Sequence, residues 1–240
     1  MKSILRYAIL SAALPLAVSA HAFDIGAEYS FNLNQSVRYD TNIGGWTGNH
    51  ETNTAVIHGN RSAGAAGGTT TLLPFATYEY DTYCIEIGQN IGGGYNTHAV
   101  VAPLLGSVTN SGGNSGPVTF DATRTANLQL LWGSFKSSVV DADTSAAFQL
   151  AQWEISFDDD VTLDQNANSR FWSNESTAYR NTAESWLTAI RTGSATTQQG
   201  LLILSDPDRQ DLVTPVPEPA SMLALAAGAA IFGARRRKRA

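Results

Sequence analysis

Alternating apolar and polar residues predict strands in the first third of the chain. Residues 24–33 place apolar side chains at every second position, which is the period of a half-buried strand. Residues 55–58 indicate a second, short strand, and residues 69–91 are dense in the β-branched and aromatic residues that strands favour. Residues 34–45 are rich in turn-forming residues, so we expect the first strand to end near Leu33.

After residue 121 the apolar residues follow the period of a helix. This spacing predicts helices over residues 126–135, 146–155 and 177–191, with Thr144 as the cap of the second. The apolar face of the second helix consists of Phe148, Ala151 and Ile155. The apolar face of the third consists of Tyr179, Ala183, Trp186, Leu187 and Ile190.

A last strand over residues 201–204 ends the predicted domain, which covers residues 23–208, and residues 209–216 are expected to be a linker. Strands come first, helices follow, and one strand comes late. This order predicts an α+β fold, with a mainly antiparallel, barrel-like sheet and a helical insertion.

The first 22 residues have the features of a signal peptide. Lys2 and Arg6 supply positive charge, residues 7–18 form an apolar run, and Ala20 and Ala22 place small residues where signal peptidase requires them. We therefore expect export and cleavage by signal peptidase after Ala22.

Three features follow one another at the other end. Pro217, Glu218 and Pro219 precede an Ala-rich apolar stretch, residues 220–234. As a helix this stretch would rise about 22 Å, short of the ~30 Å hydrocarbon core of a bilayer, which predicts a short transmembrane helix that inserts transiently. A basic cluster follows, formed by Arg235, Arg236, Arg237, Lys238 and Arg239, and it favours the cytoplasmic side as a membrane stop.

This ending, residues 217–240, resembles the PEP-CTERM sorting signal of diderm bacteria. The resemblance implies that an exosortase, a membrane protease or transpeptidase, handles the tail. It also implies a location at the cell surface or in the extracellular matrix, reached through the inner membrane. It says nothing about the activity of the domain.

Charge narrows the range of partners. Seven of the fifteen Lys and Arg residues lie in the two ends, so residues 23–234 carry eight basic and twenty-one acidic side chains, a net charge of −13. Such a domain repels nucleic acid and anionic lipid. We therefore expect no nucleic-acid partner, whereas divalent cations remain possible bridges to other molecules.

The single cysteine, Cys84, is unusual because exported domains normally have an even number of cysteines or none. It follows Tyr83 in a predicted strand. Gln149 and Trp153 lie one turn apart in the second predicted helix. These two segments resemble the thioester domains of bacterial surface adhesins, in which a Cys on a strand faces a Gln-x-x-aliphatic-Trp helix.

The resemblance implies an internal thioester between Cys84 and Gln149, in a pocket that Tyr83 and Trp153 help to shield. Gln152 stands where the family has an aliphatic residue and is a second candidate amide, although we expect it to point to a different face. The implied function is covalent attachment to an amine- or hydroxyl-bearing surface target, without enzymatic turnover. The alternative is a non-reactive structural protein of the surface or exopolysaccharide matrix.

Other chemistry has less support in the sequence. The histidines lack the short spacings of a zinc site, and no serine-protease motif is complete. Asp158, Asp160 and Asp164 form an acidic segment after the second helix, which is either a solvated turn or a calcium site. No other cofactor is indicated.

Overall fold

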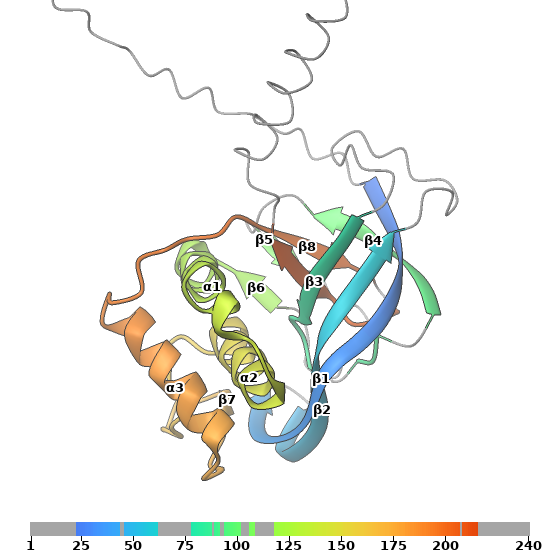
Figure 1. The fold of residues 1–240 in the computed structure, drawn as a ribbon. Helices are drawn as coiled ribbons and strands as arrows, with labels where there is room; N and C mark the ends of the chain where they lie inside the picture. The colour runs from blue at the N-terminus through green and yellow to red at the C-terminus, as the bar shows by residue number, and fades with distance from the viewer. Residues whose placement is uncertain are drawn as a thin grey trace, which may run out of the picture.

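Antiparallel strands and three helices form the fold of this computed structural model, which describes residues 23–43, 46–61, 78–87, 89–91, 94–101, 106–108, 118–206 and 208–215 (Figure 1). The strands are β1 (Phe23–Ile43), β2 (Trp46–Arg61), β3 (Tyr78–Cys84), β4 (Gly94–Val101), β5 (Gly106–Val108), β6 (Val118–Phe120), β7 (Phe171–Trp172), β8 (Leu201–Ser205) and β9 (Leu212–Pro215). The helices are α1 (Ala122–Phe135), α2 (Ala142–Phe157) and α3 (Ala178–Arg191), with a short 3₁₀ turn, η1 (Lys136–Ser138).

Six strands close into a barrel. The strands of the main sheet follow the order β2-β3-β9-β8-β4-β1-β7, and β1 also pairs with β2. This additional pairing joins the two sides of the sheet, so β1, β2, β3, β9, β8 and β4 form a ring in which every pairing is antiparallel. The predicted α+β fold with an antiparallel, barrel-like sheet is therefore confirmed.

The hairpin of β1 and β2 is much longer than the sequence indicated. We expected the first strand to end near Leu33, but β1 continues to Ile43 and pairs with β2 up to Trp46. A bulge between Asn32 and Gln35 interrupts the pairing, and Leu33 has a φ of 53° there. Such a bulge bends the strand and allows it to continue with its side chains in the correct orientation.

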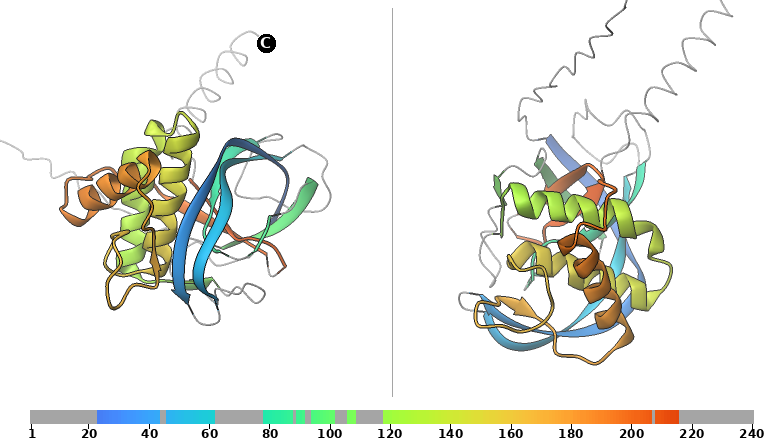
Figure 2. Two further views of the ribbon diagram at one scale, coloured as in Figure 1. Left: turned by 90° about the horizontal axis from the view of Figure 1, so that it is seen from below. Right: turned by 90° about the vertical axis from the view of Figure 1, so that its left-hand side faces the viewer.

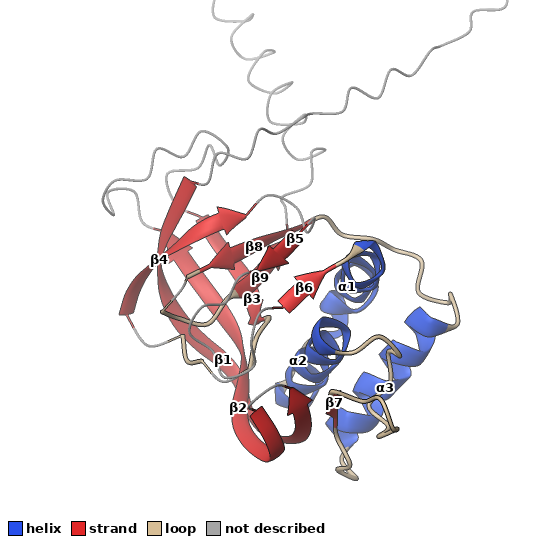
Figure 3. Cartoon of the chain, turned by 180° about the vertical axis from the view of Figure 1, so that it is seen from behind, coloured by secondary structure: helices blue, strands red, loops and turns tan. Residues whose placement is uncertain are grey.

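The three helices cover one side of the barrel, as Figures 1 and 3 show. Helix α2 lies between the barrel and the other helices: it packs against β1 and β2 and also against α1 and α3 (Figure 2). Every residue of α2 from Ser145 to Phe157 is buried. Burial of Phe148, Ala151 and Ile155 was predicted and is confirmed.

Capping explains where the helices begin. The side chain of Asp141 accepts a hydrogen bond from the Thr144 backbone N–H, 2.8 Å away, and Thr144 Oγ1 accepts one in return from the Asp141 N–H. This reciprocal pair is a capping box, so Asp141 caps α2 and the prediction of Thr144 as the cap was wrong. Thr177 caps α3, whose five predicted apolar residues are all buried.

The predicted linker over residues 209–216 is corrected by the structure. Leu212 to Pro215 form β9, which lies between β3 and β8 in the barrel, and Leu212 and Val213 are fully buried. The described part of the chain contains no helix that is both long and apolar enough for a membrane span. The predicted signal peptide, residues 1–22, and the predicted membrane helix of the tail, residues 217–240, lie outside the described residues.

Candidate functional site

Cys84 is the last residue of β3. The two edges of this strand pair with different strands. On one edge β9 pairs with Tyr83 and Cys84. On the other edge β2 pairs with β3 only as far as Thr82 among the described residues. The backbone of Cys84 therefore extends beyond the end of the β2 ladder, where its N–H and C=O need other partners.

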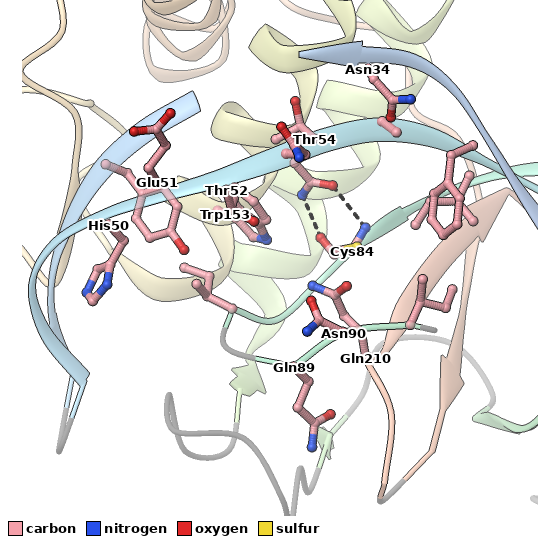
Figure 4. A pocket seen from close by; sticks show the side chains of 18 of the residues that line it. Asn34, His50, Glu51, Thr52, Thr54, Cys84, Gln89, Asn90, Trp153 and Gln210 are labelled. Carbon is pink, nitrogen blue, oxygen red and sulfur yellow. Dashed lines mark hydrogen bonds between the residues drawn. The ribbon is translucent and has the colours of Figure 1, made fainter. Parts of the chain in front are cut away.

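Gln149 supplies these partners from α2. Its Oε1 accepts a hydrogen bond from the Cys84 backbone N–H at 3.0 Å, and its Nε2 donates one to the Cys84 carbonyl at 2.7 Å. Figure 4 shows both bonds as dashed lines at Cys84. The carboxamide thus occupies the position that a neighbouring strand's peptide group would take, and it lies against the residue that carries the thiol.

Gln152 also reaches Cys84. Its Nε2 donates to the same carbonyl at 2.7 Å, and its Oε1 accepts a hydrogen bond from Trp132 Nε1 at 2.9 Å. The expectation that Gln152 points to a different face was wrong, because residues three apart on a helix are neighbours on its surface. The two amides differ in their partners: only Gln149 bonds to both polar groups of the Cys84 backbone.

A cavity of about 840 Å³ lies in front of this pair, and Cys84, Gln149 and Trp153 are part of its wall. The rest of the wall is half polar and half apolar. Its polar residues include His50, Thr52, Thr54, Gln89, Asn90 and Gln210 (Figure 4), and its apolar residues include Phe31, Tyr39, Ile57, Ile87 and Ile91. Hydroxyl and amide groups of this kind suit a ligand that carries several hydrogen-bonding groups.

The sequence singled out Trp153 as an aromatic residue of the pocket. It lines the cavity and packs against Tyr39, with ring centroids 5.3 Å apart, and Tyr39 in turn stacks on Phe171 at 5.3 Å. Tyr39 also contacts the ring of His50, at 5.5 Å. The sequence did not single out Tyr39, although it alternates with the polar residues of β1.

Tyr83 does not line the cavity, contrary to its predicted place in the pocket. It is fully buried, and its ring packs against Phe148 at 4.8 Å and Trp132 at 5.9 Å. Its hydroxyl lies 3.3 Å from Ser145 Oγ. Adjacent residues of a strand point to opposite faces, so Tyr83 anchors β3 to the helices while Cys84 faces the cavity.

Burial controls the ionisation of the groups near the thiol. It raises the pKa of Cys84 well above the ordinary value, and the Glu86 carboxylate raises it further. The thiol is therefore protonated at neutral pH. Burial lowers the pKa of His50, so its imidazole is neutral at pH 7 and able to accept a proton.

The predicted calcium residues are only partly brought together. One carboxylate oxygen each from Glu154, Asp158 and Asp160 lies within 4.8 Å of the others. Asp164 is not in this group; it forms an ion pair with Arg180. The third carboxylate of the group is Glu154 of α2, which the sequence analysis did not single out.

Comparison with known families finds a match at the C-terminal end of the chain. Residues 215–238 match the PEP-CTERM protein-sorting motif. This motif supports recognition of the chain by an exosortase. This match supports export and sorting at the cell surface or membrane of a Gram-negative bacterium. No curated protein and no solved structure matches the chain at a significant level.

Proposed function

We propose that this protein is an exported attachment module in which Cys84 Sγ and Gln149 Cδ form an internal thioester. The observation that carries the proposal is the pair of hydrogen bonds that places the Gln149 carboxamide on the Cys84 backbone, in the wall of the cavity. A strand and a buried helix hold the two residues, and such fixed proximity is what an intramolecular acyl transfer requires.

Formation of the bond needs no added reagent. The thiol attacks the carboxamide carbon, the Sγ–Cδ bond forms, the Cδ–Nε2 bond breaks, and the thiol proton leaves with ammonia. Loss of ammonia removes the Gln149 Nε2 donor from the Cys84 carbonyl. Gln152 keeps that carbonyl hydrogen-bonded after the reaction, so the backbone group stays satisfied.

Attachment follows when an amine or hydroxyl group of a surface target enters the cavity. The nucleophile bonds to Cδ, the Cδ–Sγ bond breaks, and the proton of the nucleophile passes to the released Cys84 thiolate, which becomes a thiol. His50 lines the cavity with a neutral imidazole and is suited to transfer this proton. Each molecule reacts once, so we propose an attachment protein and not an enzyme.

Amine capture tests the assignment of the partner residue. The purified exported protein should take up one equivalent of methylamine and release one thiol. Cys84→Ala and Gln149→Ala should each abolish uptake, because the bond needs both residues. Gln152→Ala is the matched control: it should melt at a lower temperature, since Trp132 loses its partner, but should still take up methylamine.

Two results would change the proposal. Uptake that is lost in Gln152→Ala and retained in Gln149→Ala would move the bond to Gln152. A free Cys84 thiol and no uptake in the unmodified protein would leave a non-reactive structural or exopolysaccharide-matrix protein.

The sorting tail completes the proposed function. We infer that Pro217, Glu218 and Pro219 mark the site of processing and that the basic cluster, residues 235–239, is absent from the mature protein. Expression in an exosortase-positive host, followed by mass spectrometry of the C-terminus, checks this. Recovery of the surface-exposed form with residues 235–240 intact would contradict it.

A further inference from the structure

The C-terminal end of α2 gathers three carboxylates from a short stretch of chain. Glu154 lies in the last turn of the helix, Asp158 is the residue at which the helix ends, and Asp160 follows in the next turn. One oxygen of each lies within 4.8 Å of the others. This distance is small enough for a single cation to contact all three.

The burial of the Glu154 carboxylate is a second, independent indication of a bound cation. Its side chain belongs to a residue with no exposed surface, and its Oε1 accepts a hydrogen bond from the Thr162 N–H at 3.1 Å. Its Oε2 and Asp160 Oδ1 are buried and receive no hydrogen bond from an N–H or O–H donor among the described residues; a hydrogen bond between these two carboxyl groups forms only when Glu154 is protonated. A buried carboxylate oxygen without a partner costs free energy, and a bound cation removes that cost.

Neighbouring arginines do not neutralise this group of carboxylates. Arg124 forms its ion pair with Asp159, and Arg180 forms one with Asp164. The charge of Arg170 also acts on Asp158, but no ion pair joins Arg170 to the three carboxylates among the described residues. The helix itself adds partial negative charge, because its last carbonyl groups point toward this end.

We propose that Glu154, Asp158 and Asp160 bind a calcium ion. The donors are all oxygen atoms, which hard cations prefer, and calcium accepts carboxylates in irregular arrangements, whereas magnesium requires a near-ideal octahedron and retains water. An exported protein also meets calcium in its surroundings more readily than a cytosolic one does.

Calcium would fix one end of the helix that carries Gln149 and Trp153. Asp158 Oδ2 already accepts hydrogen bonds from the backbone N–H groups of Arg170 and Phe171, at 2.8 and 2.9 Å. A cation on the same residue would join α2 to the segment that forms β7, which pairs with β1. The site is thus a structural clamp behind the cavity and is separate from the Cys84–Gln149 chemistry.

Titration of the purified exported protein with calcium chloride tests the proposal. After treatment with EDTA, calorimetry should detect one calcium ion bound per chain. The melting temperature should rise by about 5–10 °C at a calcium concentration about 100-fold above the dissociation constant. Magnesium at the same concentration should give a smaller rise.

Two substitutions and a matched control identify the ligands. Glu154→Gln and Asp160→Asn should abolish calcium binding. Glu154→Gln should fold in EDTA at least as stably as the unmodified protein, because Gln has the same shape and no charge to bury. Asp159→Asn alters the adjacent carboxylate, which is exposed and paired with Arg124, and should retain binding. Absence of binding and of any calcium-dependent rise in melting temperature, or binding that survives Glu154→Gln, would overturn the proposal.

Discussion

Truncation of Phe148 to alanine should be among the most destabilising single changes in the domain. Its side chain is fully buried on α2 and contacts three aromatic rings, with centroids 4.8 Å from Tyr83, 5.2 Å from Trp132 and 6.2 Å from Trp186. Phe→Ala in a core costs about 3–5 kcal/mol, and the three ring contacts place this site at the upper end, about 4–5 kcal/mol.

Urea denaturation followed by tryptophan fluorescence measures this loss. At 2–4 °C per kcal/mol for a domain of this size, the melting temperature should fall by about 8–20 °C. The same substitution at Phe31, whose side chain is 45% exposed, should cost less than about 1 kcal/mol. Equal costs at the two positions would refute the packing of α2 between the barrel and the other helices.

Two further predictions concern close packing and buried charge. Gly133→Ala should destabilise the fold by about 1–3 kcal/mol in urea titrations, because the added Cβ would clash with the Thr197 carbonyl oxygen. Helix propensity alone predicts that the substitution stabilises α1, so a stabilising effect would contradict this close contact. Burial raises the pKa of Glu86 to about 8 from 4.5 and that of Asp211 to about 6. The folded state therefore retains protons that the unfolded chain loses, so the free energy of unfolding should fall as pH rises from about 4.5 to 8. Glu86→Gln should flatten this profile and the exposed Glu51→Gln should not; an unchanged slope in Glu86→Gln would exclude Glu86 as its source.

The helices were predictable because their signals are local. In α3 five apolar residues recur at helical spacing among polar ones, and all five are buried on one face of the helix. In α2 the spacing predicted the burial of Phe148, Ala151 and Ile155 but not that of Gln152 and Glu154. Polar residues on a helix normally face solvent. The burial of Gln152 depends on Cys84 and Trp132, which are distant in sequence, and Glu154 bonds to Thr162 in the loop that follows the helix.

The strands were harder to predict because their pairing is not local. The extension of β1 to Ile43 runs through Asn, Asp and Thr residues that favour turns in isolation, and pairing with β2 overrides that preference. Strand β9 has only four residues and ends at Pro215, so nothing in its own sequence separates it from a linker. Residues 212–215 become a strand because they pair with β3 on one side and with β8 on the other, which closes the barrel.

The sequence predicted that Cys84 and Gln149 lie close together, but not the contact of Gln152 with Cys84 or the direction of the Tyr83 side chain. The segments around Cys84 and Gln149 indicated contact between a strand and a helix, and the two residues do meet. The shared contact of Gln152 follows from its helical spacing to Gln149, an argument the sequence already offered. Adjacent residues of a strand point to opposite faces, so Tyr83 must point toward the helices once Cys84 is known to face the cavity.

The intact mass of the exported protein, measured before any amine is added, tests the thioester most directly. With the thioester formed, the mass should be lower than that of the mature sequence by one ammonia, and Cys84 should not react with thiol reagents in the folded state. Cys84→Ala and Gln149→Ala should each restore the full mass expected from their sequences. A full mass and one titratable thiol in the unmodified, folded protein would contradict the central claim.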